Sequence, residues 1–343
     1  MKMKKIVLLL VTVMAMTAAL SACSVPGKPK TETVATDLFE ITIPEELSGI
    51  YEAETEDGMI SIYHKASREA GFPGLAFIIW ARETPSQYAG GPYRKVGELI
   101  SDGRYYDVVK GEATEVQWDY NEDEPEDFKK LYDAADSIIE NMRATGDGTF
   151  MYGAGTKGEE LYGYTLSQFK DALESGADAV ALEKSGYSGE FYAMLEGGAT
   201  LEDIGYAFFD ANVDGIDELF IGRRSDGAVF GIYTMVDRHP TQVVSGSAED
   251  RYFVYNGSFI ANEYSEGDDE YGWNVYNLEC NSTEMFLQWA YKYDGYEDAE
   301  NPWFKSWGDE VWEPVTEDEF NEAREKDSVY TDLGLLPLSE FEF

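Results

Sequence analysis

The chain has 343 residues and is strongly acidic, with 67 aspartates and glutamates against 26 lysines and arginines, a formal net charge of −41 at pH 7. Such a charge repels phosphate backbones and argues against nucleic acid as a partner. Hydrophobic residues still make up 43% of the chain and aromatic residues 14%, which is enough for a core and excludes a disordered protein. A chain of this length is expected to form two domains.

The N-terminus has the pattern of an export signal. Three lysines precede an apolar run over 6–20, which is too short to span a bilayer comfortably, since spanning needs about 20 apolar residues. Leu20-Ser21-Ala22-Cys23 follows at once and resembles the bacterial lipobox. The resemblance implies that 1–22 are a removed signal peptide and that Cys23 carries a lipid. The mature lipoprotein would then be secreted and anchored at the extracytoplasmic face of the cell membrane. The alternative is an ordinary secretory signal with a chance cysteine.

After a flexible tether over 23–36, rich in proline and threonine, we predict a first domain over 37–145. Its expected strands are 38–43, 50–54, 59–65, 75–81, 94–100, 105–110 and 115–120, with Glu56-Asp57-Gly58 as a hairpin turn. Apolar residues at three- and four-residue spacing predict a helix over about 126–143. An antiparallel sheet with one packed helix is an α+β fold. This order of elements resembles PsbP/Mog1-like sandwiches, which implies a binding or scaffolding role.

Five glycines within 146–160 predict an interdomain linker, and 161–343 then forms a second α+β domain, mainly β with short helices. We expect helices over 165–173, 177–195, from Thr200 and over 316–326. The expected strands are 206–209, 219–222, 229–236, 242–244, 251–255, 258–262, 273–278 and 286–292, with a type I′ turn at Asn256-Gly257.

One motif in the second domain has the residue types and spacing of a metal site. The run from Asp210 to Glu218 places oxygen ligands for Ca²⁺ at alternate positions: Asp210, Asn212, Asp214, the backbone carbonyl of Ile216, and Glu218. Calcium takes six to eight hard oxygen ligands, and Gly215 permits the sharp turn that wraps the chain around the ion. The cation also explains how several carboxylates can lie so close together. The alternative is an acidic turn without metal.

The flanking residues separate this loop from an EF-hand. An EF-hand needs a glutamate at position twelve, where this chain has Ile221, and needs helical flanks, whereas these flanks are strand-like. A calcium loop between two strands resembles the hairpin of FG-GAP and VCBS repeats, although those repeats usually have aspartate where this chain has Glu218. Only one copy is present, which argues against a propeller of such repeats.

No catalytic constellation is evident in the sequence. The two histidines lie far from any nucleophile motif, and once Cys23 is lipidated only Cys280 remains, which also rules out an internal disulfide and a convincing zinc site. We therefore favour a non-enzymatic surface protein of the binding or adhesion type. Two alternatives stay open: a calcium-stabilised carbohydrate-active hydrolase, and an accessory envelope protein that docks through its acidic face. The ligand, carbohydrate or protein, and the oligomeric state are left open.

Overall fold

The computed structural model describes residues 31–176, 182, 186–308 and 311–342. The predicted signal peptide over 1–22, Cys23 and most of the tether lie outside these residues. In the described chain every strand pair is antiparallel and strands outnumber helices, so the fold is mostly β. The antiparallel sheets of the predicted α+β fold are confirmed. None of the described helices has the length and apolar character needed to cross a membrane.

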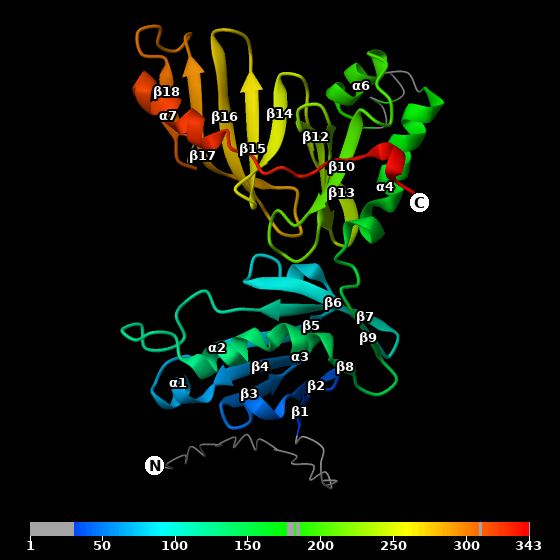
Figure 1. The fold of residues 1–343 in the computed structure, drawn as a ribbon, viewed down its shortest axis with the longest axis vertical. Helices are drawn as coiled ribbons and strands as arrows, with labels where there is room; N and C mark the ends of the chain where they lie inside the picture. Colours follow the sequence, from blue (N-terminus) through cyan, green and yellow to red (C-terminus); the bar gives the residue numbers. More distant parts are fainter. Residues whose placement is uncertain (1–30, 177–181, 183–185, 309–310, 343) are drawn as a thin grey trace, which may run out of the picture.

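The N-terminal part forms two sheets (Figure 1). Its strands are β1 (Glu32–Ala35), β2 (Phe39–Ile43), β3 (Tyr51–Glu56), β4 (Met59–His64), β5 (Leu75–Arg82), β6 (Tyr93–Ser101), β7 (Arg104–Gly111), β8 (Arg143–Ala144) and β9 (Thr149–Tyr152). Its helices are η1 (Glu45–Leu47), α1 (Lys65–Glu69), η2 (Pro85–Gln87), α2 (Glu126–Asp133) and α3 (Ala135–Glu140). The three-stranded sheet has the order β1-β2-β8, and the six-stranded sheet has the order β3-β4-β5-β7-β6-β9.

The N-terminal core lies between α2, α3 and the strands that they cover. Alternation in β2 buries Phe39, Ile41 and Ile43, and the predicted helical face buries Leu131 and Ile138 against them. The predicted single helix is divided at Ala134 into α2 and α3, but the apolar spacing continues across the break. The prediction of an antiparallel sheet covered by an amphipathic helical segment is therefore confirmed.

The C-terminal part forms one sheet of eleven strands. The strands are β10 (Ile204–Phe209), β11 (Glu218–Arg223), β12 (Val229–Val236), β13 (His239–Ser245), β14 (Asp250–Tyr255), β15 (Phe259–Ser265), β16 (Glu270–Leu278), β17 (Met285–Asp294), β18 (Trp303–Ser306), β19 (Glu313–Pro314) and β20 (Leu336–Pro337). The helices are α4 (Gly158–Ser175), α6 (Gly189–Glu196), α7 (Glu317–Asp327) and η3 (Leu338–Glu340). The main path runs from β19 through β18, β17, β16, β15, β14, β12, β11 and β10 to β20, and β13 pairs with β12.

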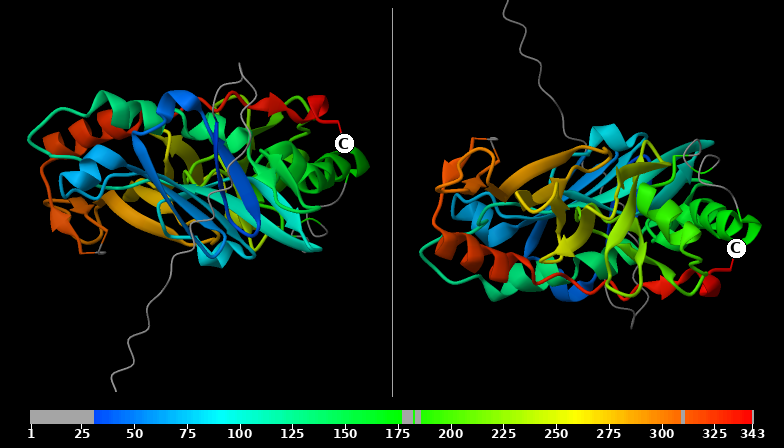
Figure 2. Two further views of the ribbon diagram at one scale, coloured as in Figure 1. Left: turned by 90° about the horizontal axis from the view of Figure 1, so that it is seen from below. Right: turned by 90° about the horizontal axis from the view of Figure 1, so that it is seen from above.

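Helices cover the two ends of this sheet. Viewed from above, α4 lies at the end that carries β10, away from β17 and β18 (Figure 2). At the other end α7 packs Phe320 against Trp273 of β16. Its N-terminus has the predicted capping box between Thr316 and Glu319. The predicted turn at Asn256-Gly257 has the two positive φ angles, 50° and 73°, that a type I′ turn requires.

Several predicted elements differ from the structure. The predicted strand over 115–120 is a loop, because the Gln117 side chain accepts a hydrogen bond of 3.0 Å from the Leu75 amide and the segment does not join the sheet. The predicted helix at Thr200 is a turn closed by the Asp203 carboxylate. The helix predicted over 177–195 lies partly outside the described residues, and α6 covers its end.

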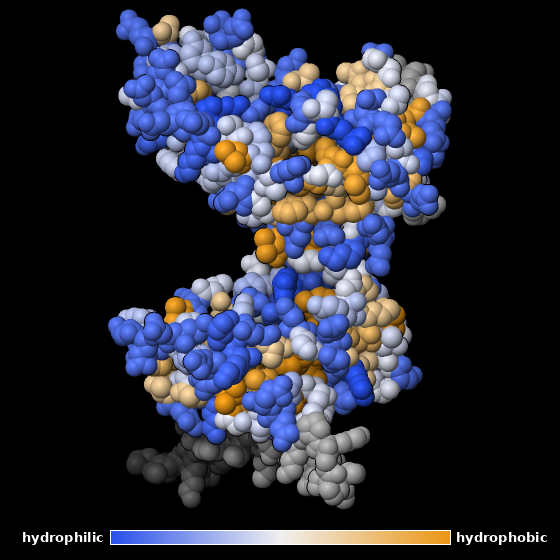
Figure 3. Space-filling model, in the orientation of Figure 1, coloured by the Kyte–Doolittle hydropathy of each residue, from blue (hydrophilic) through white to orange (hydrophobic). Residues whose placement is uncertain are grey.

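The two segments that we predicted to lack regular structure, the tether and the linker, contain strands in the structure. Within the tether, β1 pairs with β2, starting from Glu32 opposite Ile43. Within the linker over 146–160, β9 extends the six-stranded sheet by pairing with β6, and α4 begins at Gly158. Glycines did not prevent pairing here because they flank β9, which itself contains none. The N-terminal and C-terminal parts meet where the molecule narrows (Figure 3).

Candidate functional site

The acidic loop of the sequence connects β10 to β11 at the end of the C-terminal sheet that faces the N-terminal part. Its turn needs two residues with positive φ, Val213 at 61° and Gly215 at 86°. Two buried strands hold its ends, since β10 and β11 pair from Ile204 opposite Arg223 to Phe209 opposite Glu218. The loop is therefore a hairpin loop between strands, as the sequence predicted.

Side-chain oxygens of the loop accept hydrogen bonds from the loop's own amides. The Asp210 carboxylate accepts from the amides of Asp214 (3.1 Å) and Gly215 (3.0 Å). The side-chain oxygen of Asn212 also accepts from the Asp214 amide, and Asp214 Oδ1 accepts from the Ile216 amide at 2.9 Å. These bonds bring Asp210, Asn212 and Asp214 together around one turn.

Glu218 closes the loop from the far side. Its carboxylate accepts hydrogen bonds from the Ala211 amide (2.8 Å), the Asn212 side-chain amide (3.2 Å) and the Thr234 hydroxyl (3.0 Å). Four of the five predicted ligand residues are thus linked to one another by hydrogen bonds, and the fifth, Ile216, is linked through its amide. In the described chain, no group of three or more Asp, Glu, His or Cys side chains is already arranged to hold a metal ion.

Burial sets the electrostatics of the loop. Glu218 is fully buried and Asp214 is 6% exposed. Removal from water raises the pKa of Asp214 to about 7, and burial together with the nearby Asp214 charge raises the pKa of Glu218 well above its ordinary value. No lysine or arginine within the described residues forms an ion pair with Asp210, Asp214 or Glu218. The donors in place are neutral, so ionisation of these buried carboxylates is disfavoured unless a cation is present, and their hard oxygens fit Ca²⁺.

The loop also contacts the N-terminal sheet. Because β9 pairs with β6 only from Gly97 to Ile100, the Lys95 amide lies beyond the end of β9. This amide donates a hydrogen bond of 2.6 Å to the carbonyl oxygen of Asp214. A Cβ at Gly215 would lie 2.3 Å from the Lys95 carbonyl oxygen, so only glycine allows this approach. The loop is tied to both parts of the molecule.

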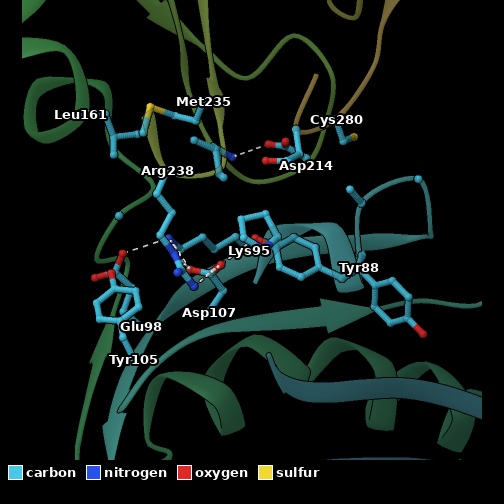
Figure 4. Close-up of a pocket in the computed structure, with 17 residues that line it drawn as sticks. Tyr88, Lys95, Glu98, Tyr105, Asp107, Leu161, Asp214, Met235, Arg238 and Cys280 are labelled. Atoms are coloured by element: carbon cyan, nitrogen blue, oxygen red, sulfur yellow. Dashed lines mark hydrogen bonds and ion pairs between the residues drawn. The ribbon is translucent and has the colours of Figure 1, made fainter. Parts of the chain in front are cut away.

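A cavity of about 200 Å³ lies beside this contact. Apolar side chains from both parts line most of it, including Tyr88, Leu161, Met235 and Cys280. Figure 4 shows Arg238 reaching from the turn between β12 and β13 toward Asp107 on β7. The cavity is thus built jointly by residues far apart in the sequence, which no sequence pattern indicated.

The charged groups of the cavity pair with one another. Lys95 Nζ lies 2.9 Å from both the Glu98 and the Asp107 carboxylates. Arg238 lies 2.9 Å from Asp107 and packs over the ring of Tyr105. Asp107 is fully buried, so its charge is balanced by two cations supplied by different sheets. This network joins the two parts of the molecule next to the acidic loop.

Cys280 contributes a thiol to the wall of the cavity. Burial and the Asp214 carboxylate raise its pKa to about 12. A thiol with such a pKa has almost no thiolate at neutral pH and is a poor nucleophile. Cys280 is therefore better described as a residue that packs in the cavity wall than as a nucleophile.

Three residues form a triad-like arrangement that sequence reasoning missed. His64 Nδ1 lies 2.8 Å from the Ser67 hydroxyl, and His64 Nε2 lies 3.2 Å from the Asp127 carboxylate. The Ser67 amide also donates to Nδ1, so His64 caps the N-terminus of α1. Ser67 is only 5% exposed and the His64 ring packs against Phe128, so a substrate cannot reach the hydroxyl. The helix-capping spacing of His64 and Ser67 was the only sequence signal for this contact.

Comparisons of the chain with protein-family models, with curated proteins and with solved structures give no match in any of the three. The predicted resemblances to the lipobox, to FG-GAP and VCBS hairpins and to PsbP/Mog1-like sandwiches therefore remain predictions from the residues alone.

Proposed function

We propose that this protein is a non-enzymatic lipoprotein of the binding type, anchored at the extracytoplasmic face of the membrane through a lipid on Cys23. It consists of two domains, and one structural Ca²⁺ ion stabilises their junction. The ion is held by Asp210, Asn212, Asp214, Glu218 and the Ile216 carbonyl. The observation that carries the proposal is the position of the loop, whose buried carboxylates lack a cationic partner among the described residues and whose Asp214 carbonyl bonds to Lys95.

The hydrogen bonds within the loop support a structural role for the ion. Without a cation, buried carboxylates in a medium of low dielectric constant repel one another, and neutral donors offset only part of that cost. A bound Ca²⁺ supplies the missing positive charge and stabilises the loop. Because Asp214 contacts Lys95 through its backbone, ordering of the loop also strengthens the contact between the two sheets. Extracytoplasmic calcium concentrations suit a site of modest affinity.

The cavity supports a binding protein over a hydrolase. Glycoside hydrolysis needs one carboxylic acid with a raised pKa and a second carboxylate poised across the scissile bond. Three carboxylates line the cavity. Glu98 and Asp107 form ion pairs with Lys95 and Arg238, and Asp214, whose pKa is raised, accepts a hydrogen bond from the Ile216 amide within its own loop. A nucleophile is also unsupported, since the pKa of Cys280 is about 12.

Membrane fractionation tests the anchoring. The wild-type chain should partition with membranes and into detergent, whereas Cys23→Ser should be released as soluble protein, because an acyl chain contributes about 0.8 kcal/mol per buried CH₂ group. Cys280→Ser is the matched control and should partition like the wild type. Retention of Cys23→Ser in the membrane fraction would contradict the proposal.

A further inference from the structure

The two faces of the sheet formed by β14, β15 and β16 differ in what covers them. On one face, Trp273 and Glu263 are covered by α7, which contributes Asp327 to the indole nitrogen of Trp273 and Arg324 to the Glu263 carboxylate. Side chains alternate along a strand, so the neighbouring residues point to the opposite face. That face carries a groove of about 500 Å³, which we call the β14–β16 groove.

Cross-strand pairing builds the floor of the β14–β16 groove. Tyr252 of β14 pairs with Asn262 of β15, which pairs with Asn274 of β16. The Asn262 side chain is 95% buried and donates to the Asp250 carboxylate, while its oxygen accepts from Asn274 at 3.1 Å. The other Asp250 oxygen accepts from the Tyr252 hydroxyl at 3.2 Å. The floor is therefore a fixed row of planar amide and carboxylate groups whose orientation is set by one another.

Some polar atoms of this row remain available to a ligand. In the described part of the chain, neither the side-chain oxygen of Asn274 nor the hydroxyl of Tyr264 has a hydrogen-bond partner. An amide oxygen accepts up to two hydrogen bonds, and a phenol both donates and accepts. The tyrosine rings add flat apolar surface beside these polar atoms.

We infer that the β14–β16 groove binds a neutral oligosaccharide, a ligand class that deepens the proposed binding function and rests on it. Sugar hydroxyls both donate and accept, and sugar rings offer apolar faces, which matches amides alternating with tyrosine rings. The residues that line the groove include no basic and no aliphatic side chain, which disfavours anionic and lipid-like ligands. Glu249 and Glu266 are exposed at the rim, where solvent weakens their attraction for cations. The one carboxylate on the floor, Asp250, is already engaged by Asn262 and Tyr252.

Isothermal titration of the full chain in detergent tests this inference. The probes are maltohexaose, cellohexaose, xylohexaose, mannohexaose and chitohexaose, with octalysine as a cationic probe. We expect at least one hexasaccharide to bind, and Asn274→Ala to weaken that binding about fivefold, as expected for one lost hydrogen bond. Tyr264→Phe keeps the ring and should weaken binding by a similar factor, so the test survives if Asn274→Ala misfolds.

Matched controls lie on β16, on the face opposite the groove. Asn277→Ala and Tyr271→Phe change the same residue types at exposed positions and should leave hexasaccharide binding unchanged. Absence of binding to every hexasaccharide would overturn the inference, as would binding that Asn274→Ala and Tyr264→Phe both leave intact. Octalysine binding that these variants weaken, without hexasaccharide binding, would also overturn it and assign the groove to a basic peptide. None of these results depends on calcium or on membrane retention, so failure here is separate from failure of the proposed function.

Discussion

The amide of Lys95 donates a hydrogen bond of 2.6 Å to the carbonyl oxygen of Asp214, and this bond joins β6 of the N-terminal sheet to the acidic loop of the C-terminal sheet. It forms where β9 has ended and the edge of β6 is open. The proposed ion site and the contact between the two sheets therefore share one residue. A change in the conformation of the loop would therefore also affect β6, through the bond between Asp214 and Lys95.

Replacement of Gly215 tests this close approach. Gly215→Ala introduces a Cβ at 2.3 Å from the Lys95 carbonyl oxygen and places alanine at φ 86°. We expect the free energy of unfolding to fall by about 2–5 kcal/mol, from left-handed backbone strain and steric overlap together. Gly227→Ala is the control, because Gly227 has φ 74° but open space around it, and should cost about 1–2 kcal/mol. Equal losses in urea denaturation would mean that Lys95 does not restrict Gly215.

The buried charge network gives a second prediction. Asp107→Asn removes the carboxylate that balances Lys95 and Arg238 and should lower the free energy of unfolding by about 3–5 kcal/mol, the usual cost of breaking a buried ion pair. Glu83→Gln removes the partner of Arg104 in an exposed pair and should cost about 0.5 kcal/mol or less. Urea denaturation of both variants measures the difference. If Asp107→Asn lowers the free energy of unfolding by less than about 1 kcal/mol, the result would contradict the structural role of the network.

Some features were predictable because they depend on neighbouring residues alone. The turns at Asp57-Gly58 and Asn256-Gly257 need positive φ, which aspartate, asparagine and glycine tolerate. The Thr316 capping box is likewise local. The loop from Asp210 to Glu218 could be recognised because its oxygens recur at fixed spacing.

Other features depend on contacts between distant segments and could not be predicted. Nothing near Lys95 in the sequence indicates that its amide meets Asp214, and nothing near Asp107 indicates Arg238. The segment over 115–120 alternates like a strand, but Gln117 holds it as a loop by bonding to the amide of Leu75. Tertiary contacts overrode the local pattern in these places.

The reactivity of Cys280 provides a third prediction. Since its pKa is about 12, only about one thiol in 10⁴ is ionised at pH 8, against roughly a quarter of a free cysteine with pKa 8.5. Iodoacetamide should therefore alkylate Cys280 at least about a hundredfold more slowly in the folded protein than in the protein denatured in about 6 M guanidinium chloride. Mass spectrometry of the alkylated peptide over time gives both rates. Similar rates would mean that the thiol is not held in the buried setting described.

Limited proteolysis tests which segment between strands is most accessible. Residues 112–125 contain no helix or strand and expose 78% of Tyr120, whereas β9 is hydrogen-bonded to β6. Chymotrypsin should therefore cleave after Tyr120 faster than after Tyr152, which is 49% exposed within β9. Tyr120→Ser should slow the first cleavage. First cleavage within 146–160 would instead support the linker that the glycines suggested.

The central claim is that one Ca²⁺ ion on the loop stabilises the junction through Asp214, and hydrogen exchange measures this most directly. At 2 mM calcium, a site with Kd of about 0.1–1 mM would stabilise the folded state by about 0.6–1.8 kcal/mol. Calcium should slow amide exchange in the peptide over 204–223 and also in the β6 peptide that contains Lys95, relative to EDTA. Asp214→Asn should lose both effects. Asp217→Asn should keep them, because the Asp217 side chain bonds to the Gly158 amide at the start of α4 and not to the loop. Exchange that calcium leaves unchanged in both peptides of the wild-type protein would contradict the account.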